Sequence, residues 1–146
     1  APRDLAPPYW IDMGAMAIST LAGTLLIINA SSAPYLASLL PFLKGITLLY
    51  WATGSWWIPM LVLLELWRYA YARTPFEYDP LLWGAVFPLG MYAACTWQMD
   101  RAMDFGFLLG VSHAFLFVAL AAWIITFAGM IHGLVRHLAG RSKSPR

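Results

Sequence analysis

The stretch LWGAVFPLGMYAACT, residues Leu82–Thr96, is strongly apolar and yet contains proline and glycine. Soluble helices avoid this composition, because proline removes a backbone hydrogen-bond donor and glycine lowers helix propensity. Here Pro88 lies between Gly84 and Gly90. Membrane helices tolerate such residues where the helix packs inside the protein or lines a cavity. The stretch therefore favours a helix in the interior of a membrane protein.

The composition of the whole chain points the same way. Of its 146 residues, 61% are hydrophobic and 11% are charged, whereas about a quarter of the residues of an average soluble domain are charged. A chain of this size cannot bury so much apolar surface in its own core. The net charge of +2 gives no reason to expect a nucleic-acid partner, and the single cysteine, Cys95, excludes an internal disulfide. We expect an all-α integral membrane protein.

Four segments are apolar and long enough to cross a bilayer core about 30 Å thick, which requires about 20 helical residues. They are residues 9–30, 41–67, 80–98 and 107–134. The second segment would be about 40 Å long, and residues 53–55 (TGS) could divide it into two spans. Lysine and arginine collect in cytoplasmic loops. An undivided second segment places more of these residues on one side of the membrane than a divided one does. The sequence therefore predicts four transmembrane helices in two hairpins, with both ends cytoplasmic.

The two ends of the chain are polar. Residues 1–8 form a lead-in, residues 9–137 a partial transmembrane pore domain and residues 138–146 a basic tail. The opening sequence APRDLAPPYW has neither an initiator methionine nor the n-region of a signal peptide. We therefore expect a piece of a longer protein, or a processed one.

The chain lacks the motifs of an enzyme or a metal site. It contains no nucleophile elbow, no HExxH sequence and no phosphate-binding glycine loop. His113 and His132 lie on one predicted helix, about 28 Å apart, and cannot share a metal ion or a haem. We expect no catalytic residue, no metal and no cofactor. A third interpretation is a haem-binding membrane subunit. It would be excluded if the purified protein showed no Soret absorption.

The segment 80–98 presents one unusual face. On a helical wheel this face contains Gly84, Phe87, Gly90, Met91 and Ala94. Pro88 frees the carbonyl near residue 84 and favours a kink there. Two interpretations are open: Phe87 is a hydrophobic gate that excludes water from a pore, or the helix packs through its glycines and Phe87 fills space.

The four segments also differ in side-chain size. Segments 9–30 and 80–98 are rich in glycine, alanine, serine and threonine, and segments 41–67 and 107–134 are bulkier. Small residues permit close helix packing in membranes. The first pair would be inner helices, close-packed or lining a cavity, and the second pair would be outer helices.

Three runs carry a resemblance to a known family: YDPLLWGAVFPLGMYAACT (78–96), WATGSWWIPMLVLLELWRY (51–69) and PYWIDMGAMAISTLAG (8–23). From about residue 8 to about residue 137, the chain resembles the tellurite-resistance and C4-dicarboxylate transporter family, which includes the plant slow anion channels. The resemblance implies ten transmembrane helices in five hairpins around a central pore. The four segments would be its last four helices. The family's occluding phenylalanine precedes a proline on helix nine, and Phe87 occupies that place.

The resemblance implies an anion channel or carrier of the inner (plasma) membrane, for small inorganic anions or C4-dicarboxylates such as tellurite, sulfite or malate. The gate would be Phe87 with Pro88. The pore-lining residues would be Gly84, Gly90, Met91, Ala94, Gly14, Ser19 and Thr20. The expected partners are lipid, small anions, a homotrimer of the complete protein, and further N-terminal helices from the same or another chain. The alternative is a scaffold or assembly subunit without a pore.

Overall fold

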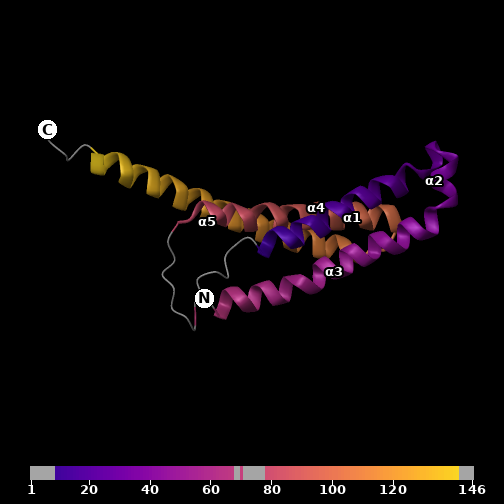
Figure 1. Ribbon diagram of the computed structural model, residues 1–146, viewed down its shortest axis with the longest axis horizontal. Helices are drawn as coiled ribbons and strands as arrows, with labels where there is room; N and C mark the ends of the chain where they lie inside the picture. Colours follow the sequence, from indigo (N-terminus) through magenta and orange to yellow (C-terminus); the bar gives the residue numbers. More distant parts are fainter. Residues whose placement is uncertain (1–8, 68–69, 71–77, 142–146) are drawn as a thin grey trace.

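The computed structural model describes residues 9–67, 70 and 78–141, with side chains to residue 139. Its elements are helices and short 3₁₀ turns: α1 (Tyr9–Ile28), η2 (Ala30–Ser32), α2 (Pro34–Ser38), α3 (Leu40–Leu66), η4 (Pro80–Leu82), α4 (Trp83–Met103) and α5 (Leu108–Arg141). In Figure 1, α1 and α4 run in one direction, and α3 and α5 run back in the other. The described chain is therefore two antiparallel hairpins, α1–α3 and α4–α5.

Three of the described helices, α1, α3 and α5, are long and apolar enough to cross a membrane. α3 is one continuous helix through Gly54 and Pro59, so residues 53–55 do not divide it. α4, the expected third span, is not among the three. Its 21 residues match the 20 of α1 in length, but it ends with Gln98, Asp100 and Arg101, which lower its mean hydropathy.

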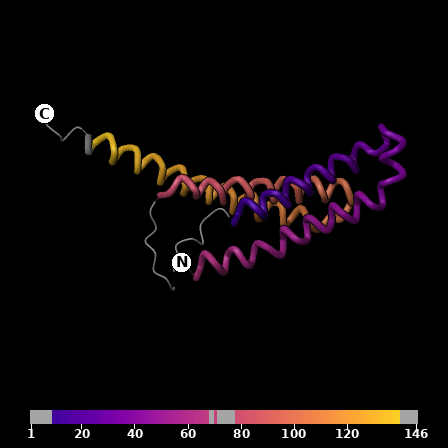
Figure 2. The backbone as a smooth tube through the Cα atoms, viewed as in Figure 1, coloured from indigo at the N-terminus to yellow at the C-terminus, as the bar shows by residue number. Residues whose placement is uncertain are grey.

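α5 differs most from the segment expected for it. It continues to Arg141, beyond the expected end at residue 134 and into the expected tail. Figure 2 shows this part of α5 extending past the ends of the other helices. The lead-in, residues 1–8, and the tail after Arg141 lie outside the described residues.

The α1–α3 hairpin closes where glycines let the helices approach. The Thr47 side chain lies directly against the Cα atom of Gly23, where any side chain would collide with its hydroxyl. A Cβ atom on Gly54 would lie 3.4 Å from the Cβ atom of Met16. Small residues at such contacts let membrane helices associate by van der Waals packing.

The α4–α5 hairpin begins at a tight turn. Asp104 ends α4 in the left-handed region, at φ 56°, and Gly106 follows at φ 68°. The Asp100 carboxylate then accepts a hydrogen bond of 3.2 Å from the Leu108 backbone N–H, which opens α5. One turn later the Ser112 hydroxyl donates to the Ala93 carbonyl oxygen at 2.8 Å. These bonds fix the register of α5 on α4.

Candidate pore-lining face

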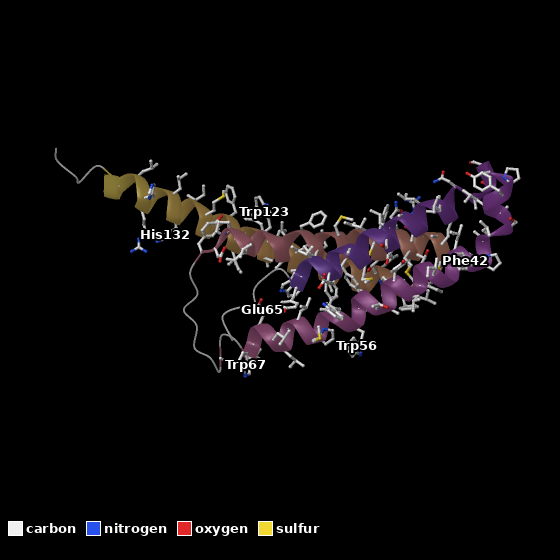
Figure 3. The ribbon with its side chains drawn as sticks, viewed as in Figure 1. Phe42, Trp56, Glu65, Trp67, Trp123 and His132 are labelled. Carbon is white, nitrogen blue, oxygen red and sulfur yellow. The ribbon has the colours of Figure 1, made fainter. Side chains whose placement is uncertain are left out.

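α1 and α4 run in the same direction (Figure 1) and pack on each other, with α3 against α1 and α5 against α4; we call this central pair the inner layer and α3 and α5 the outer helices. They meet where Pro88 lies against Gly14: a Cβ atom on Gly14 would be 3.1 Å from Cγ of Pro88. α3 packs against both helices, through glycine contacts to α1 and hydrogen bonds to α4. On its far side, Trp56 is 70% exposed and projects away from the bundle (Figure 3). α3 therefore lies on the outside of the α1–α4 pair and has one uncovered side.

One stripe of α4 stays uncovered along most of the helix. Its residues recur every three or four positions, as a single helical face requires. They are Phe87, Gly90, Ala94, Trp97 and Arg101, of which only Gly90 is half-buried. Phe87 is 56% exposed, whereas its neighbours Pro88 and Leu89 are buried.

α1 carries a matching stripe. Its exposed residues are again spaced by three and four: Ile11, Ala15, Ile18, Ala22, Leu25 and Asn29. Gly14 of α1 faces α4, while Met16 and Gly23 face α3. At about 100° per residue, the stripe points away from both of these neighbours.

The two stripes lie on the same side of the inner layer. Tyr92 and Thr96 of α4 point toward α3, with which they form hydrogen bonds, and Phe87 and Ala94 lie on the opposite side of the helix. Because α1 and α4 are parallel and α3 packs against both, both stripes face away from α3. We call the two stripes together the open face.

The structure separates the predicted pore residues into two groups. Phe87, Gly90 and Ala94 lie on the open face, and the half-buried Gly84, Met91 and Ser19 lie beside it or at its edge. Pro88, Gly14 and Thr20 are buried in helix contacts.

The buried predicted residues have partners inside the bundle. Pro88 and Gly14 pack against each other. The Thr20 hydroxyl donates to the Met16 carbonyl oxygen of its own helix at 2.9 Å. In these positions Gly14 packs against α4, and the Thr20 hydroxyl proton is used within α1.

The middle of the open face is uncharged. Among the residues of α1 and α4, Asp12 near the start of α1 and Asp100 and Arg101 near the end of α4 are the charged ones. Asp100 is buried and caps α5. Arg101 is exposed, with its guanidinium 4.8 Å from the centre of the Trp97 ring. The described residues also include no group of three His, Cys, Asp or Glu side chains that could hold a metal ion.

Sequence reasoning missed a polar bridge between α3 and α4. The Trp51 indole N–H donates to the Thr96 hydroxyl at 3.0 Å, and the Ser55 and Tyr92 hydroxyls are 2.6 Å apart. Ser55 also donates to the Trp51 carbonyl oxygen, so Tyr92 is the donor to Ser55. The sequence does show these four polar side chains inside apolar segments. It could not predict which of them pair, because the pairing depends on how the two hairpins dock.

The comparisons with known proteins agree with a membrane transport fold. The model of the voltage-dependent anion channel (SLAC1) family matches residues 1–131. An uncharacterized membrane protein of Mycobacterium tuberculosis is 39% identical over 141 residues, which are 97% of this chain and 71% of that protein.

More distant similarity extends to longer proteins. An uncharacterized transporter of Methanocaldococcus jannaschii is 25% identical over 132 residues, which are 90% of this chain and 36% of the transporter. A second transporter of that organism is 25% identical over 126 residues, 86% of this chain and 34% of its own length. No solved structure matches the chain significantly.

Proposed function

Because the chain belongs to the voltage-dependent anion channel family, we propose that its open face lines an anion-conducting path with Phe87 as the constriction. Membership implies an anion channel or transporter rather than an enzyme. The resemblance to tellurite-resistance and C4-dicarboxylate transporters, expected from the sequence, falls within this family.

The observation that carries the proposal is the arrangement of Phe87 on the open face. The ring is exposed, although Pro88 beside it is buried against α1. Gly90 and Ala94 follow it on the same face, and Ala15 and Ala22 lie on the α1 stripe. A large ring beside small residues narrows a path at its own level; the other ring on this face of α4, Trp97, lies about 15 Å further along the helix. Hydrophobic constrictions of this kind gate by excluding water.

The charges near the open face suit anion passage. With no charged side chain midway on the open face, this part of the wall presents no fixed charge that would trap or repel an anion, and discrimination along it rests on the loss of the hydration shell of the ion. Arg101 lies at one end of the open face. A cation there raises the local concentration of anions, an effect that salt screens.

The proposed substrates are small inorganic anions or C4-dicarboxylates, in the class of tellurite, sulfite and malate. Two parallel helices form only part of a wall, so the path is completed by further helices from the same or another chain. The proposed setting is a homotrimer in the inner membrane with the ends of this chain in the cytoplasm, as the lysine and arginine distribution favours.

Phe87→Ala in the complete protein, reconstituted in liposomes, tests the gate. We expect chloride and nitrate flux to rise several-fold, because the constriction is removed. The matched control is Phe117→Ala, a ring 70% exposed on the outer helix α5, which should leave flux unchanged. Unchanged flux in both variants contradicts the gate. No anion flux under any condition, with normal assembly, favours the scaffold without a pore.

A further inference from the structure

The end of α5 forms a surface separate from the open face. α5 has 34 residues and is therefore about 50 Å long, whereas a bilayer core is about 30 Å thick. We call residues 128–141 the α5 extension. Figure 1 shows this extension beyond the ends of α1, α3 and α4. Because the extension carries His132, Arg136 and His137 after a mostly apolar stretch of α5, we infer that it lies at the boundary between lipid and water.

A cavity of about 620 Å³ lies along this boundary. Tyr78 and Leu82, which precede α4, line one side. α5 lines the other side with residues that include Ile125, His132 and Arg136. No acidic side chain is among the described residues that line it.

Tyr78 is held in place as a wall of this cavity by two glycines of α5. A Cβ atom on Gly129 would lie 3.1 Å from Cδ2 of Tyr78, and one on Gly133 would lie 3.8 Å from Cδ1. The Tyr78 hydroxyl accepts a hydrogen bond of 3.4 Å from the Trp83 indole N–H. Because the hydroxyl accepts in this bond, it can still donate its proton to a ligand, and no acceptor for that proton is found among the described residues.

The α5 wall changes from apolar to cationic along the helix. Ile125 and Ala128 come first, followed by His132 and then Arg136. His132 and Arg136 are four residues apart and share one helix face, and both are exposed. Figure 3 shows His132 on the part of α5 that extends beyond the bundle. The change in polarity takes place over about 16 Å, which corresponds to the passage from acyl chains to headgroups.

We propose that this cavity binds an anionic phospholipid. The headgroup phosphate lies between Arg136, His132 and the Tyr78 hydroxyl, and an acyl chain lies along Ala128 and Ile125. Arginine binds phosphate through two parallel hydrogen bonds, and basic pockets beside transmembrane helices suit anionic headgroups. This inference goes beyond anion transport and does not depend on Phe87.

The test measures lipid binding to the full-chain protein purified in detergent. Phosphatidylglycerol should raise the unfolding temperature, and phosphatidylcholine should do so much less. Arg136→Gln should weaken phosphatidylglycerol binding about tenfold, the size expected for one lost charge-assisted contact. His132→Gln should weaken it less. The matched control is His137→Gln, on the same exposed stretch of α5 but outside the cavity lining, which should bind normally.

A second variant tests the apolar part of the cavity. Ala128→Phe fills the space beside Ile125 and should weaken phosphatidylglycerol binding without removing a charge. An equal response to both lipids, or an equal loss in His132→Gln and His137→Gln, overturns the proposal. Inorganic phosphate that raises the unfolding temperature as far as phosphatidylglycerol, and competes with it, would show a site for free phosphate and would also overturn it.

Discussion

Pro88 of α4 lies against Gly14 of α1, so close that a Cβ atom on Gly14 would come within 3.1 Å of the proline ring. This contact sets the rotation of α4 about its own axis. Because Pro88 is turned into the bundle, the preceding residue, Phe87, is turned out onto the open face. The proline therefore has a packing role besides its lack of a backbone donor, and the gate proposed at Phe87 depends on it.

Replacing Gly14 by leucine should separate α1 from α4. The new side chain meets the Pro88 ring, which is part of the α4 backbone path and cannot swing away. We expect the free energy of unfolding to fall by about 1–3 kcal/mol, as overpacked cores do, measured by thermal unfolding in detergent. Gly45→Leu is the control, since nothing lies within 4 Å of a Cβ atom there. Equal losses in both variants would contradict the contact.

Gly23→Ala should also destabilise the protein, and a second substitution should rescue it. The added methyl group would meet the Thr47 hydroxyl, as well as its Cβ atom at 3.0 Å and its Cγ2 atom at 3.1 Å. Thr47→Ala removes the hydroxyl and Cγ2 of that side chain. We expect the double variant to unfold at a higher temperature than Gly23→Ala alone. If Thr47→Ala adds a further loss instead, the two residues are not in contact.

Removing the acceptor from the α3–α4 polar bridge should destabilise the protein more than removing a donor from it. Thr96→Val leaves the Trp51 indole N–H without its acceptor, and an unsatisfied buried donor costs about 1–3 kcal/mol. Tyr92→Phe removes a donor, while Ser55 keeps its bond to the Trp51 carbonyl oxygen. Its cost should be about 0.6 kcal/mol, the average for hydrogen bonds between membrane helices. Thermal unfolding of the two variants should give this order, and the reverse order would exclude our assignment of donors.

A new ring at Ala94 should close a path opened at Phe87. Ala94 lies on the open face about 10 Å further along α4. We expect the Phe87→Ala, Ala94→Phe double variant to return anion flux in liposomes to the level of the unaltered protein. Ala121→Phe, on an exposed position of α5, should not reduce the flux of Phe87→Ala. If the double variant conducts as much anion flux as Phe87→Ala, Ala94 does not line the path.

Arg101→Gln should reduce anion flux at low salt and have little effect at high salt. Screening shortens the range of a surface charge from about 10 Å at 0.1 M to about 3 Å at 1 M ionic strength. The control, Lys44→Gln, removes an exposed charge from the same end of the bundle but from the outer helix α3. A loss of flux that is independent of salt would assign Arg101 a structural role, through its contact with Trp97.

Helical periodicity was enough to place Phe87, Gly90 and Ala94 on one face, because spacing within a helix is a local property. Periodicity could not predict which neighbouring helix covers each face of a helix. Gly14 and Thr20 were expected to line the pore; in the structure Gly14 packs on Pro88, and the Thr20 hydroxyl donates to a carbonyl oxygen of its own helix. Small residues serve equally for helix contact and for pore lining, so only the docked hairpins distinguish the two uses.

The ends of α4 and α5 show a second limit of prediction from the sequence. Apolar composition ended the fourth segment near residue 134, but α5 continues to Arg141 because helix formation does not require apolar residues. α4 is missing from the apolar spans because Gln98, Asp100 and Arg101 lie near its end, although the buried Asp100 carboxylate is satisfied by the Leu108 backbone N–H. Hydropathy ranks residue types by their own polarity, and it does not register the protein partners that satisfy a polar side chain.

The bridge from Trp51 to Thr96 also bears on how the protein is made. The two residues are 45 positions apart, so α3 leaves the ribosome well before its partner on α4 exists. Until α4 arrives, the Trp51 indole N–H lacks its acceptor on α4, which favours a position of this side chain near water or lipid headgroups. The first hairpin is therefore expected to insert shallowly or loosely, and to reach its final depth only when the second hairpin is synthesised.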